Sequence, residues 1–407
     1  MPIDELQGLC RRLAIEDIPA SWPDSWTAFE AWLGAGGCDA MNWELPPCAA
    51  RVFALPEGSV PALQELLQAI RANSDLRALA SFWHYMAYHL PGGMERYTNG
   101  WAVPDKLCGF PTKLMFLAAL ASGADHALAN FAATGVSEEV ALLSLGYIGY
   151  YTSDIKKKRG VWGLESLGWL SCYTRAEIFR LGRLTFKEGR NGSQFRAYRN
   201  RTTGELIVLC PPAKYRADGQ ADGSNGIFDP DAWTAALEIS EDAVVGHPVR
   251  DCAAQREPIS LPKSEWEPVM GPGDDIVEVH IAGGSKMLHE DCVDAYRQAM
   301  EFFPRNYPDR DFRGFTCWSW LLDPALARIL SPDSNIVRFQ RDFYQLPVCS
   351  NEAQCYDLVF GDSGVDPTKL TPTTGLQRAI IDYVASGGKM KAAAGYITWE
   401  RALALTS

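Results

Sequence analysis

The sequence predicts an α+β protein in which a mostly helical N-terminal domain, residues 1–180, precedes a mixed α/β domain, residues 181–407. Apolar residues recur at helical spacing through much of the first part, whereas short runs of β-type residues separated by turn residues begin after Leu181. With 407 residues, 47% of them hydrophobic, the chain is long enough to bury the cores of two or three domains.

The N-terminal domain is expected to consist of helices. A helix over residues 4–13 is followed by a stretch rich in tryptophan, proline and glycine that we expect to be irregular to about residue 60. From Pro61 the apolar residues form one helical stripe, which continues on a second helix from Leu76. Further helices are expected over residues 112–120, 125–133, 138–153 and 165–181. Ser137 is the expected N-cap of the helix that starts at residue 138, because its hydroxyl can accept a hydrogen bond from a first-turn N–H.

Strand patterns dominate the start of the second domain. A strand over residues 183–187 and a hairpin over 195–209, with Gly204 near its turn, precede a helix over 228–239. An extended, proline-rich connector, residues 252–273, follows. The last part is expected to contain a strand over residues 312–322, a helix over 325–330, a strand or helix over 336–343, a strand over 355–360 and a helix over 374–386.

The stretch on which the functional prediction rests is Ile276–Ile281 and the turn that follows it. Strict alternation predicts a strand in which Glu278 and His280 point to the same face. The next residues include Gly283, Gly284 and Lys286, before a helix over 290–303. Glycines permit a tight bend, and a helix N-terminus offers unpaired N–H groups, so this stretch can bind an anion. The same arrangement also occurs in proteins that bind no phosphate.

Glu278 and His280 are the best acid–base pair in the sequence, because a carboxylate and an imidazole on one face can accept a proton from an amine or hydroxyl. The alternative is a pair that only hydrogen-bonds a neighbouring strand. Cys317 and Ser319 alternate with Trp318 and Trp320; either could donate a proton to a departing thiolate, or Cys317 could be a covalent nucleophile. For Cys317 we favour the simpler interpretation of a small buried apolar residue, and Ser319 remains a candidate donor.

Composition and charge exclude several classes of protein. A net charge of -12 and a pI near 5.1 argue against bulk affinity for nucleic acid or anionic membranes, so we expect neither as a partner. Eleven cysteines without a C-x-x-C pair favour a reducing, cytoplasmic location, and the six histidines show no metal-ligand spacing with them, so no metal is expected. The basic run at 156–159 either terminates a helix or forms the rim of an anionic-ligand site.

Three segments carry a resemblance to a known family. They are Val277-Glu-Val-His-Ile-Ala-Gly-Gly284, Cys317-Trp-Ser-Trp-Leu-Leu-Asp-Pro324 and Pro332-Asp-Ser-Asn-Ile-Val-Arg-Phe-Gln340. They resemble a bacterial two-domain acyltransferase-like family, which has a helical N-acyltransferase N-terminal domain and a GNAT-like C-terminal domain. The chain departs from this family at Ala282, where a proline is expected.

The resemblance implies that acyl-CoA or acetyl-CoA binds between two splayed parallel strands, with its pyrophosphate on the turn after the first strand. The implied cofactor-binding residues are Ile281, Ala282, Gly283, Gly284, Ser285, Lys286, Cys317 and Trp318. Glu278 or His280 would be the base, with Ser319 as a third candidate catalytic residue.

The function predicted on this basis is an acyl-CoA-dependent N-acyltransferase that transfers an acetyl or other short acyl group to a small-molecule or peptide amine. The alternative is a GNAT-like ligand-binding or sensor protein that performs no transfer. Neither the acceptor nor the oligomeric state follows from the sequence.

Overall fold

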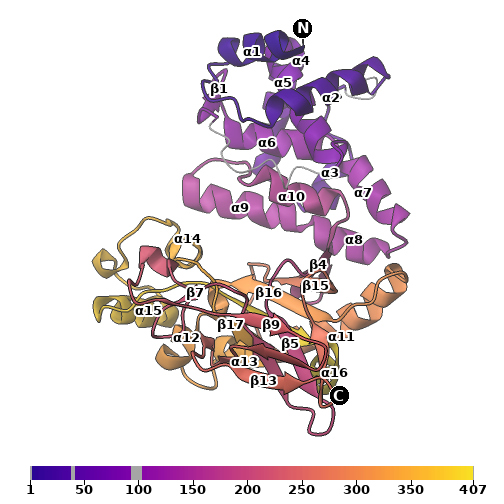
Figure 1. Ribbon diagram of the computed structural model, residues 1–407. Coiled ribbons are helices and arrows are strands. Elements are labelled where there is room, and N and C mark those ends of the chain that lie inside the picture. Colours follow the sequence, from indigo (N-terminus) through magenta and orange to yellow (C-terminus); the bar gives the residue numbers. More distant parts are fainter. Residues whose placement is uncertain (1, 38–41, 93–102, 407) are drawn as a thin grey trace. The chain divides into compact units, whose positions relative to one another are not determined.

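The chain divides into two compact units, Met1–Arg180 and Leu181–Ser407, in a computed structural model that describes residues 2–37, 42–92 and 103–406 (Figure 1). The first unit is helical and the second combines a mixed sheet with helices. The predicted α+β fold class, with helices first and a mixed α/β region after them, is confirmed.

The first unit is organised around one buried helix, α5 (Ser74–Tyr88). Every residue of α5 from Leu79 to Tyr88 is buried, as expected for a helix covered on all sides. It contacts α1 (Pro2–Arg12), α2 (Trp22–Gly34), α4 (Ser59–Ala72), α6 (Thr112–Ala121) and α10 (Leu167–Thr174). The remaining elements are α3 (Ala49–Val52), the short hairpin β1 (Lys106–Leu107) and β2 (Phe110–Pro111), α7 (Ala124–Ala133), α8 (Glu138–Leu145) and α9 (Tyr147–Arg159).

Three predictions for this unit were wrong in part. The tryptophan-rich stretch contains α2 and α3, because Trp22 and Trp26 pack their rings against Phe82 of α5. The helix predicted over 138–153 is two helices that meet at Gly146, although Ser137 caps the first of them as expected. The helix predicted over 165–181 ends at Thr174, and its last residues instead form β3 (Ile178–Leu181).

The second unit contains a six-stranded sheet in the order β17-β18-β16-β15-β4-β3. Its further strands are β4 (Leu184–Arg190), β15 (Asp275–His280), β16 (Gly314–Ser319), β17 (Tyr344–Leu346) and β18 (Ala393–Thr398). β15 and β16 are parallel and are joined through α11 (His289–Asn306). Phe303 and Tyr296 of α11 pack their rings against Phe186 and Phe315, so α11 covers one face of the sheet. α13 (Asn335–Asp342) and α16 (Trp399–Thr406) contact α11.

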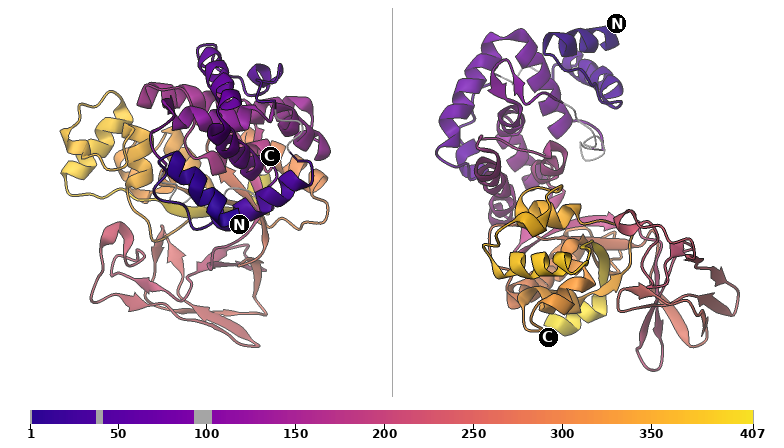
Figure 2. Two further views of the ribbon diagram at one scale, coloured as in Figure 1. Left: turned by 90° about the horizontal axis from the view of Figure 1, so that it is seen from above. Right: turned by 90° about the vertical axis from the view of Figure 1, so that its left-hand side faces the viewer.

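A lobe of short strands lies beside this sheet within the same unit (Figure 2). It comprises β5 (Arg196–Asn200), β6 (Leu206–Leu209), β7 (Lys214–Tyr215), the 3-10 turn η2 (Ser224–Gly226), β8 (Trp233–Thr234), β9 (Leu237–Ile239), β10 (Ala243–Gly246), β11 (Val249–Arg250), β12 (Ala253–Ala254), β13 (Ile259–Pro262) and β14 (Trp266–Met270). Its buried residues share one apolar cluster with Ile276, Leu346 and Tyr396 of the six-stranded sheet, which joins the lobe to the sheet.

The last helices form another apolar cluster of the second unit. They are η3 (Trp320–Leu322), α12 (Pro324–Ile329), α14 (Ala353–Phe360), η4 (Pro367–Lys369) and α15 (Gly375–Ala385). Asp323 caps α12 as the sequence indicated, because its carboxylate accepts a hydrogen bond from Ala325 N–H at 2.9 Å.

Three predictions for the second unit were wrong. Residues 252–273, expected to be an extended connector, contain β12, β13 and β14, because these segments pair with β11, β10 and β5. Residues 228–239 form β8 and β9 and not a helix, since each pairs with a strand distant in sequence, β7 and β10. Residues 355–360 belong to α14 and not to a strand, because Cys355 and Tyr356 pack into the helical cluster and Gly361, at φ 85°, ends the helix. Residues 336–343, for which strand and helix remained open, lie largely in α13.

No single helix in the described parts of the chain is both long and apolar enough to cross a membrane. The bent pair of α6 and α7 reaches that length and apolar character when the two helices are taken together. Ten cysteines of the described residues are free thiols.

Candidate active site

The two parallel strands β15 and β16 separate at their carboxyl ends. They pair only at Val277 with Phe315 and at Glu278 with Thr316. Beyond this point β15 continues beside β4 as far as His280, and β16 continues beside β18 as far as Ser319. Each strand is therefore held by its outer neighbour while a gap opens between them. Backbone N–H and C=O groups at the edges of such a gap can bind an extended ligand.

One face of the sheet brings the candidate polar residues together at this gap. Residues that are partners across two paired strands point to the same face of the sheet, and every second residue along a strand does so too. Glu278 and His280 therefore share a face with Thr316, the partner of Glu278, and with Trp318. This is the face opposite α11. The Trp318 side chain is 57% exposed and stands beside the gap. An exposed indole at this position offers a flat apolar surface to a ligand.

The Glu278 carboxylate and the His280 imidazole form a direct hydrogen bond, with 3.2 Å between Oε2 and Nε2. Both side chains are about one-third exposed, at 36% and 31%, so a substrate can reach them. The β15 backbone positions the pair, since Glu278 is opposite Lys187 and His280 opposite Thr185 in β4. When Nε2 donates its proton to Glu278, the other ring nitrogen carries the lone pair and can act as a base.

The turn after β15 is held by a residue that the sequence analysis did not select, Arg183. Its guanidinium, 7% exposed, donates hydrogen bonds to the carbonyl oxygens of Ala282 at 2.7 Å, Lys286 at 3.0 Å and Ser285 at 3.1 Å. In a trans peptide the N–H points away from the C=O, so the amides that follow these three carbonyls face away from Arg183. Arg183 therefore orients the turn with its N–H groups outward.

The rest of the predicted anion-binding turn is open to solvent. Gly284, Ser285 and Lys286 are exposed, Gly283 and Ile281 are partly buried, and Ala282 is buried. Gly284 has φ 95°, a conformation that favours glycine. Helix α11 starts at His289 without a side-chain cap, which leaves its first N–H groups available, while Glu290 and Asp291 place negative charge in its first turn.

A second pair that the sequence analysis missed lies at the start of α11. His289 Nε2 is 3.0 Å from both carboxylate oxygens of Asp342, which is nearly buried at the end of α13. Burial raises the pKa of the Asp342 carboxyl, and the hydrogen bond from His289 opposes this shift. The two residues are far apart in sequence and no local motif signals the pair. It fixes the first residue of α11 against α13.

Cys317 and Ser319 lie on the α11 face of β16, away from Glu278 and His280. Burial raises the pKa of the Cys317 thiol to about 12, which disfavours the thiolate that a nucleophile needs and supports the apolar interpretation. Ser319 accepts a hydrogen bond from Leu321 N–H at 3.1 Å and so caps η3. The fold does not bring these two side chains to the face that carries the candidate base.

Two further features are a cavity of the second unit and the basic run of the first unit. A cavity of 560 Å³ is at the β17 edge of the sheet, two strands beyond β16, and is lined by Leu206, Arg250, Cys252, Tyr344 and Arg401 among others. The basic run at the end of α9 is engaged within its own unit: Lys156 donates to Gly160 O, Lys158 pairs with Asp154, and Arg159 pairs with Glu165. These contacts favour the interpretation of the run as a helix C-terminus.

The helical first unit, the mixed sheet and the splayed parallel strands define a two-domain protein with a GNAT-like second domain. Residues 178–397 match the family described as the GNAT-like C-terminal domain, and residues 46–176 match the N-acyltransferase N-terminal domain. The chain belongs to this two-domain acyltransferase-like family and is an acyltransferase, which confirms the resemblance noted in the sequence.

Solved structures share the fold over nearly the whole chain. An acyltransferase in complex with decanoyl-CoA and teicoplanin is 16% identical, with a TM-score of 0.62, and the match covers 96% of this chain and 98% of that one. A mutant acyltransferase in complex with octanoyl-CoA is 15% identical, with a TM-score of 0.61 and the same coverage. An acyltransferase in complex with decanoyl-CoA is 17% identical, with a TM-score of 0.59 and again the same coverage. No curated protein sequence matches the chain.

Proposed function

We propose that this protein transfers an acyl group from acyl-CoA to an amine acceptor. The observation that carries the proposal is the separation of β15 and β16 after Glu278 and Thr316. The pantetheine arm of coenzyme A is an extended amide chain, and unpaired strand edges can bind such a chain much as they bind a peptide. Trp318 would line the same gap with apolar surface.

The turn at residues 282–288 would bind the pyrophosphate. Arg183 directs its N–H groups outward, Lys286 adds a positive charge, and the N-terminus of α11 favours an anion. These attractions must overcome the two acidic residues in the first turn of α11. Backbone amides give a phosphate site that depends on the fold of the turn more than on any single side chain.

In the proposed reaction the amine nitrogen attacks the thioester carbonyl carbon. The C–N bond forms, the C–S bond breaks, and the coenzyme A thiolate leaves and takes up a proton. The Glu278–His280 pair accepts the proton that the amine loses, and the hydrogen bond between them orients the imidazole. Backbone N–H groups at the strand ends would stabilise the oxyanion. Ser319 stays a candidate proton donor, although it lies on the other face.

The structural neighbours suggest the length of the acyl chain. They hold octanoyl-CoA and decanoyl-CoA, and two hold a teicoplanin-type compound. We therefore propose a medium-length acyl donor in preference to acetyl-CoA, and a small-molecule amine acceptor. A cytoplasmic location stays a prediction from the cysteine content.

The decisive experiment combines binding with turnover in the full-length protein. Thermal unfolding is recorded with coenzyme A and with acetyl-, octanoyl- and decanoyl-CoA, and thiol release is then followed with a panel of small-molecule amines. The expected result is a rise in Tm with coenzyme A, a larger rise with the longer acyl chains, and amine-dependent thiol release. Stabilisation without release for any amine would favour the sensor alternative. An unchanged Tm at millimolar coenzyme A would exclude both.

A further inference from the structure

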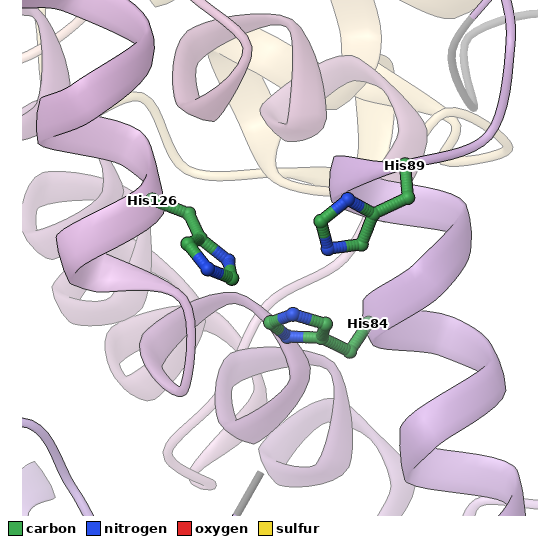
Figure 3. A group of neighbouring side chains, drawn as sticks. All are labelled: His84, His89 and His126. Carbon is green, nitrogen blue, oxygen red and sulfur yellow. The ribbon is translucent and has the colours of Figure 1, made fainter. Parts of the chain in front are cut away.

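Three of the six histidines meet inside the first unit. His84 lies in the last part of α5, His89 directly follows that helix, and His126 lies near the start of α7. Figure 3 shows the three rings pointing toward one another. One ring nitrogen from each lies within 4.8 Å of the other two. Sequence spacing gave no sign of this group, because the packing of α7 beside the end of α5 creates it.

The tautomer of His84 is set by its hydrogen bonds. Its Nδ1 lies 2.9 Å from Ser122 Oγ and 3.2 Å from Ala119 O, while Ser122 Oγ donates its own proton to Ala119 O at 3.1 Å. Nδ1 must therefore carry the proton, which leaves the Nε2 of His84 with a bare lone pair. The side chain is 1% exposed, and this Nε2 has no hydrogen-bond partner among the described residues. His89 Nε2 is also buried and has no hydrogen-bond partner in the described parts of the chain.

We propose that His84, His89 and His126 bind one divalent transition-metal ion, for which zinc is the expected choice, with a fourth position open to water or another ligand. Neutral imidazoles suit zinc, and three of them with an open position form a recognised zinc geometry. With Zn–N bonds of about 2.0 Å at tetrahedral angles, ligand nitrogens are about 3.3 Å apart. The three rings need only small inward movements to reach that spacing.

Burial disfavours the charged form of two of the three rings. Burial, followed by the nearby His89 and His126, lowers the pKa of His84 to about 3; burial, followed by His126 and Arg175, lowers that of His89 to about 4. Imidazole binds a metal through a ring nitrogen that carries no proton, and the hydrogen bonds of His84 Nδ1 leave its Nε2 in that form. Asp125, which accepts a hydrogen bond from the Cys48 thiol at 2.9 Å, provides negative charge next to His126 in the chain.

An aromatic cluster without a metal is the competing interpretation. The Trp32 ring stacks on His89 at 4.8 Å and the Tyr88 ring stacks on His84 at 4.7 Å. These contacts satisfy the ring faces but leave two buried ring nitrogens, His84 Nε2 and His89 Nε2, without a hydrogen-bond partner among the described residues, which is unfavourable. A metal ion satisfies them. The bonds from His84 Nδ1 to Ser122 and Ala119 are also the outer-shell contacts expected of a metal-ligating histidine.

The test uses the full-length, tag-free protein after removal of metal with a chelator. Zn²⁺ is titrated in competition with a chromogenic chelator, and Co²⁺ is titrated while its visible absorption is recorded, because the spectrum reports nitrogen coordination. One ion per chain is expected. Loss of an outer-shell partner usually costs about 10-fold to 100-fold in affinity, so His84→Asn and His126→Asn should each weaken binding by at least about 100-fold, and Ser122→Ala by about 10-fold.

The variants are chosen so that folding and binding can be separated. In His84→Asn the amide can still donate the bond that Nδ1 makes, and His126 is exposed, so both variants should retain the circular dichroism spectrum of the wild type. His247→Asn is the control: His247 is also buried, with Nδ1 3.2 Å from Gln255 O, but it lies in the other unit. Equal zinc affinity in His126→Asn, His84→Asn and the wild type, or no saturable binding by the wild type, would overturn the proposal. The outcome is independent of acyl transfer, since the readout involves no coenzyme A.

Discussion

At the scale of single residues, the candidate chemistry depends on a carboxylate and an imidazole two positions apart on one strand. Glu278 and His280 are within hydrogen-bond distance of each other, at 3.2 Å, and remain accessible. The strand pairing with β4 fixes the backbones of both residues. The pair is therefore suited to accept a proton at an open face of the sheet.

Replacing either residue of this pair should reduce turnover while leaving acyl-CoA binding intact. For Glu278→Gln and His280→Asn we expect kcat to fall by about 100-fold to 10,000-fold, the range typical of a lost general base. The measurement is thiol release, with acyl-CoA affinity followed separately by thermal shift. Glu238→Gln, an exposed carboxylate of β9, is the matched control and should leave kcat unchanged. Wild-type kcat in both site variants would remove the pair from the mechanism.

Cys317 gives a second prediction at this scale. Burial raises its thiol pKa to about 12, so it stays protonated at pH 8, where an alkylating reagent modifies thiolates. We expect the exposed Cys108 and Cys349 to be alkylated in the native protein while Cys317 is not, as read by peptide mass spectrometry. Cys317→Ala should keep thiol release close to the wild-type rate. Rapid labelling of Cys317, or loss of turnover in this variant, would instead identify a reactive thiol.

The raised pKa of buried thiols also makes the stability of the protein depend on pH. A folded-state pKa above the ordinary value of 9.0 means that the native state holds protons that the unfolded state has lost. The contribution of such a thiol to the free energy of unfolding is fully present below about pH 9 and is lost as the pH rises toward 12. Cys210, Cys292 and Cys355 share the shift. The protein should therefore lose stability in this alkaline range.

At the scale of elements, the important device is the connection from β15 to α11. Arg183 at the start of β4 holds three carbonyls of the turn, although about 100 residues separate them along the chain, which makes its contacts long-range by any measure of sequence distance. Because the guanidinium is a rigid fork with several donors, it can hold three acceptors at once, which an ammonium group cannot do with the same geometry.

Arg183→Lys should loosen the turn without removing the positive charge. We expect the KM for acyl-CoA to rise by about 10-fold, with little change in kcat, because the residue positions the turn and does not touch the reacting atoms. Steady-state kinetics and the acyl-CoA thermal shift measure both effects. Arg190→Lys is the control, since the side chain of Arg190, the last residue of β4, is 65% exposed. An unchanged KM in Arg183→Lys would mean that the turn does not contact the donor.

At the scale of the whole molecule, the chain consists of two units with separate cores. The first is built around α5 and contains the histidine group; the second contains the six-stranded sheet and the Glu278–His280 face. Neither group of functional residues includes a side chain from the other unit. The two proposals of metal binding and acyl transfer can therefore be tested independently.

Because each group of residues lies within a single unit, we expect that removing metal will not change the affinity for acyl-CoA. Sites that share no residues usually show additive effects, so a change at one site is expected to leave the other unaltered. Thermal shifts with decanoyl-CoA, recorded with and without a chelator and in His126→Asn, provide the measurement. A change of more than about 3-fold in affinity would show that the sites are coupled, because additive sites agree within about 0.5 kcal/mol.

The sequence alone determined the features that depend on near neighbours in the chain. Alternation was enough to place Glu278 and His280 on one face, and Ser137 and Asp323 were recognisable N-caps because a cap bonds within its own first turn. The division into a helical and a mixed α/β part followed from periodicity. The family resemblance rested on motifs that lie within single segments.

Only the tertiary structure decided the features that depend on distant partners. Residues 228–239 became strands because β7 and β10 supplied their hydrogen bonds, and residues 355–360 became a helix because a helical cluster was there to cover them. Arg183 met its turn, and His84 met His126, through packing that no local pattern encodes. The physical reason is the same in each case: burial and hydrogen bonding are satisfied by whichever groups the fold brings near, and that choice belongs to the whole chain.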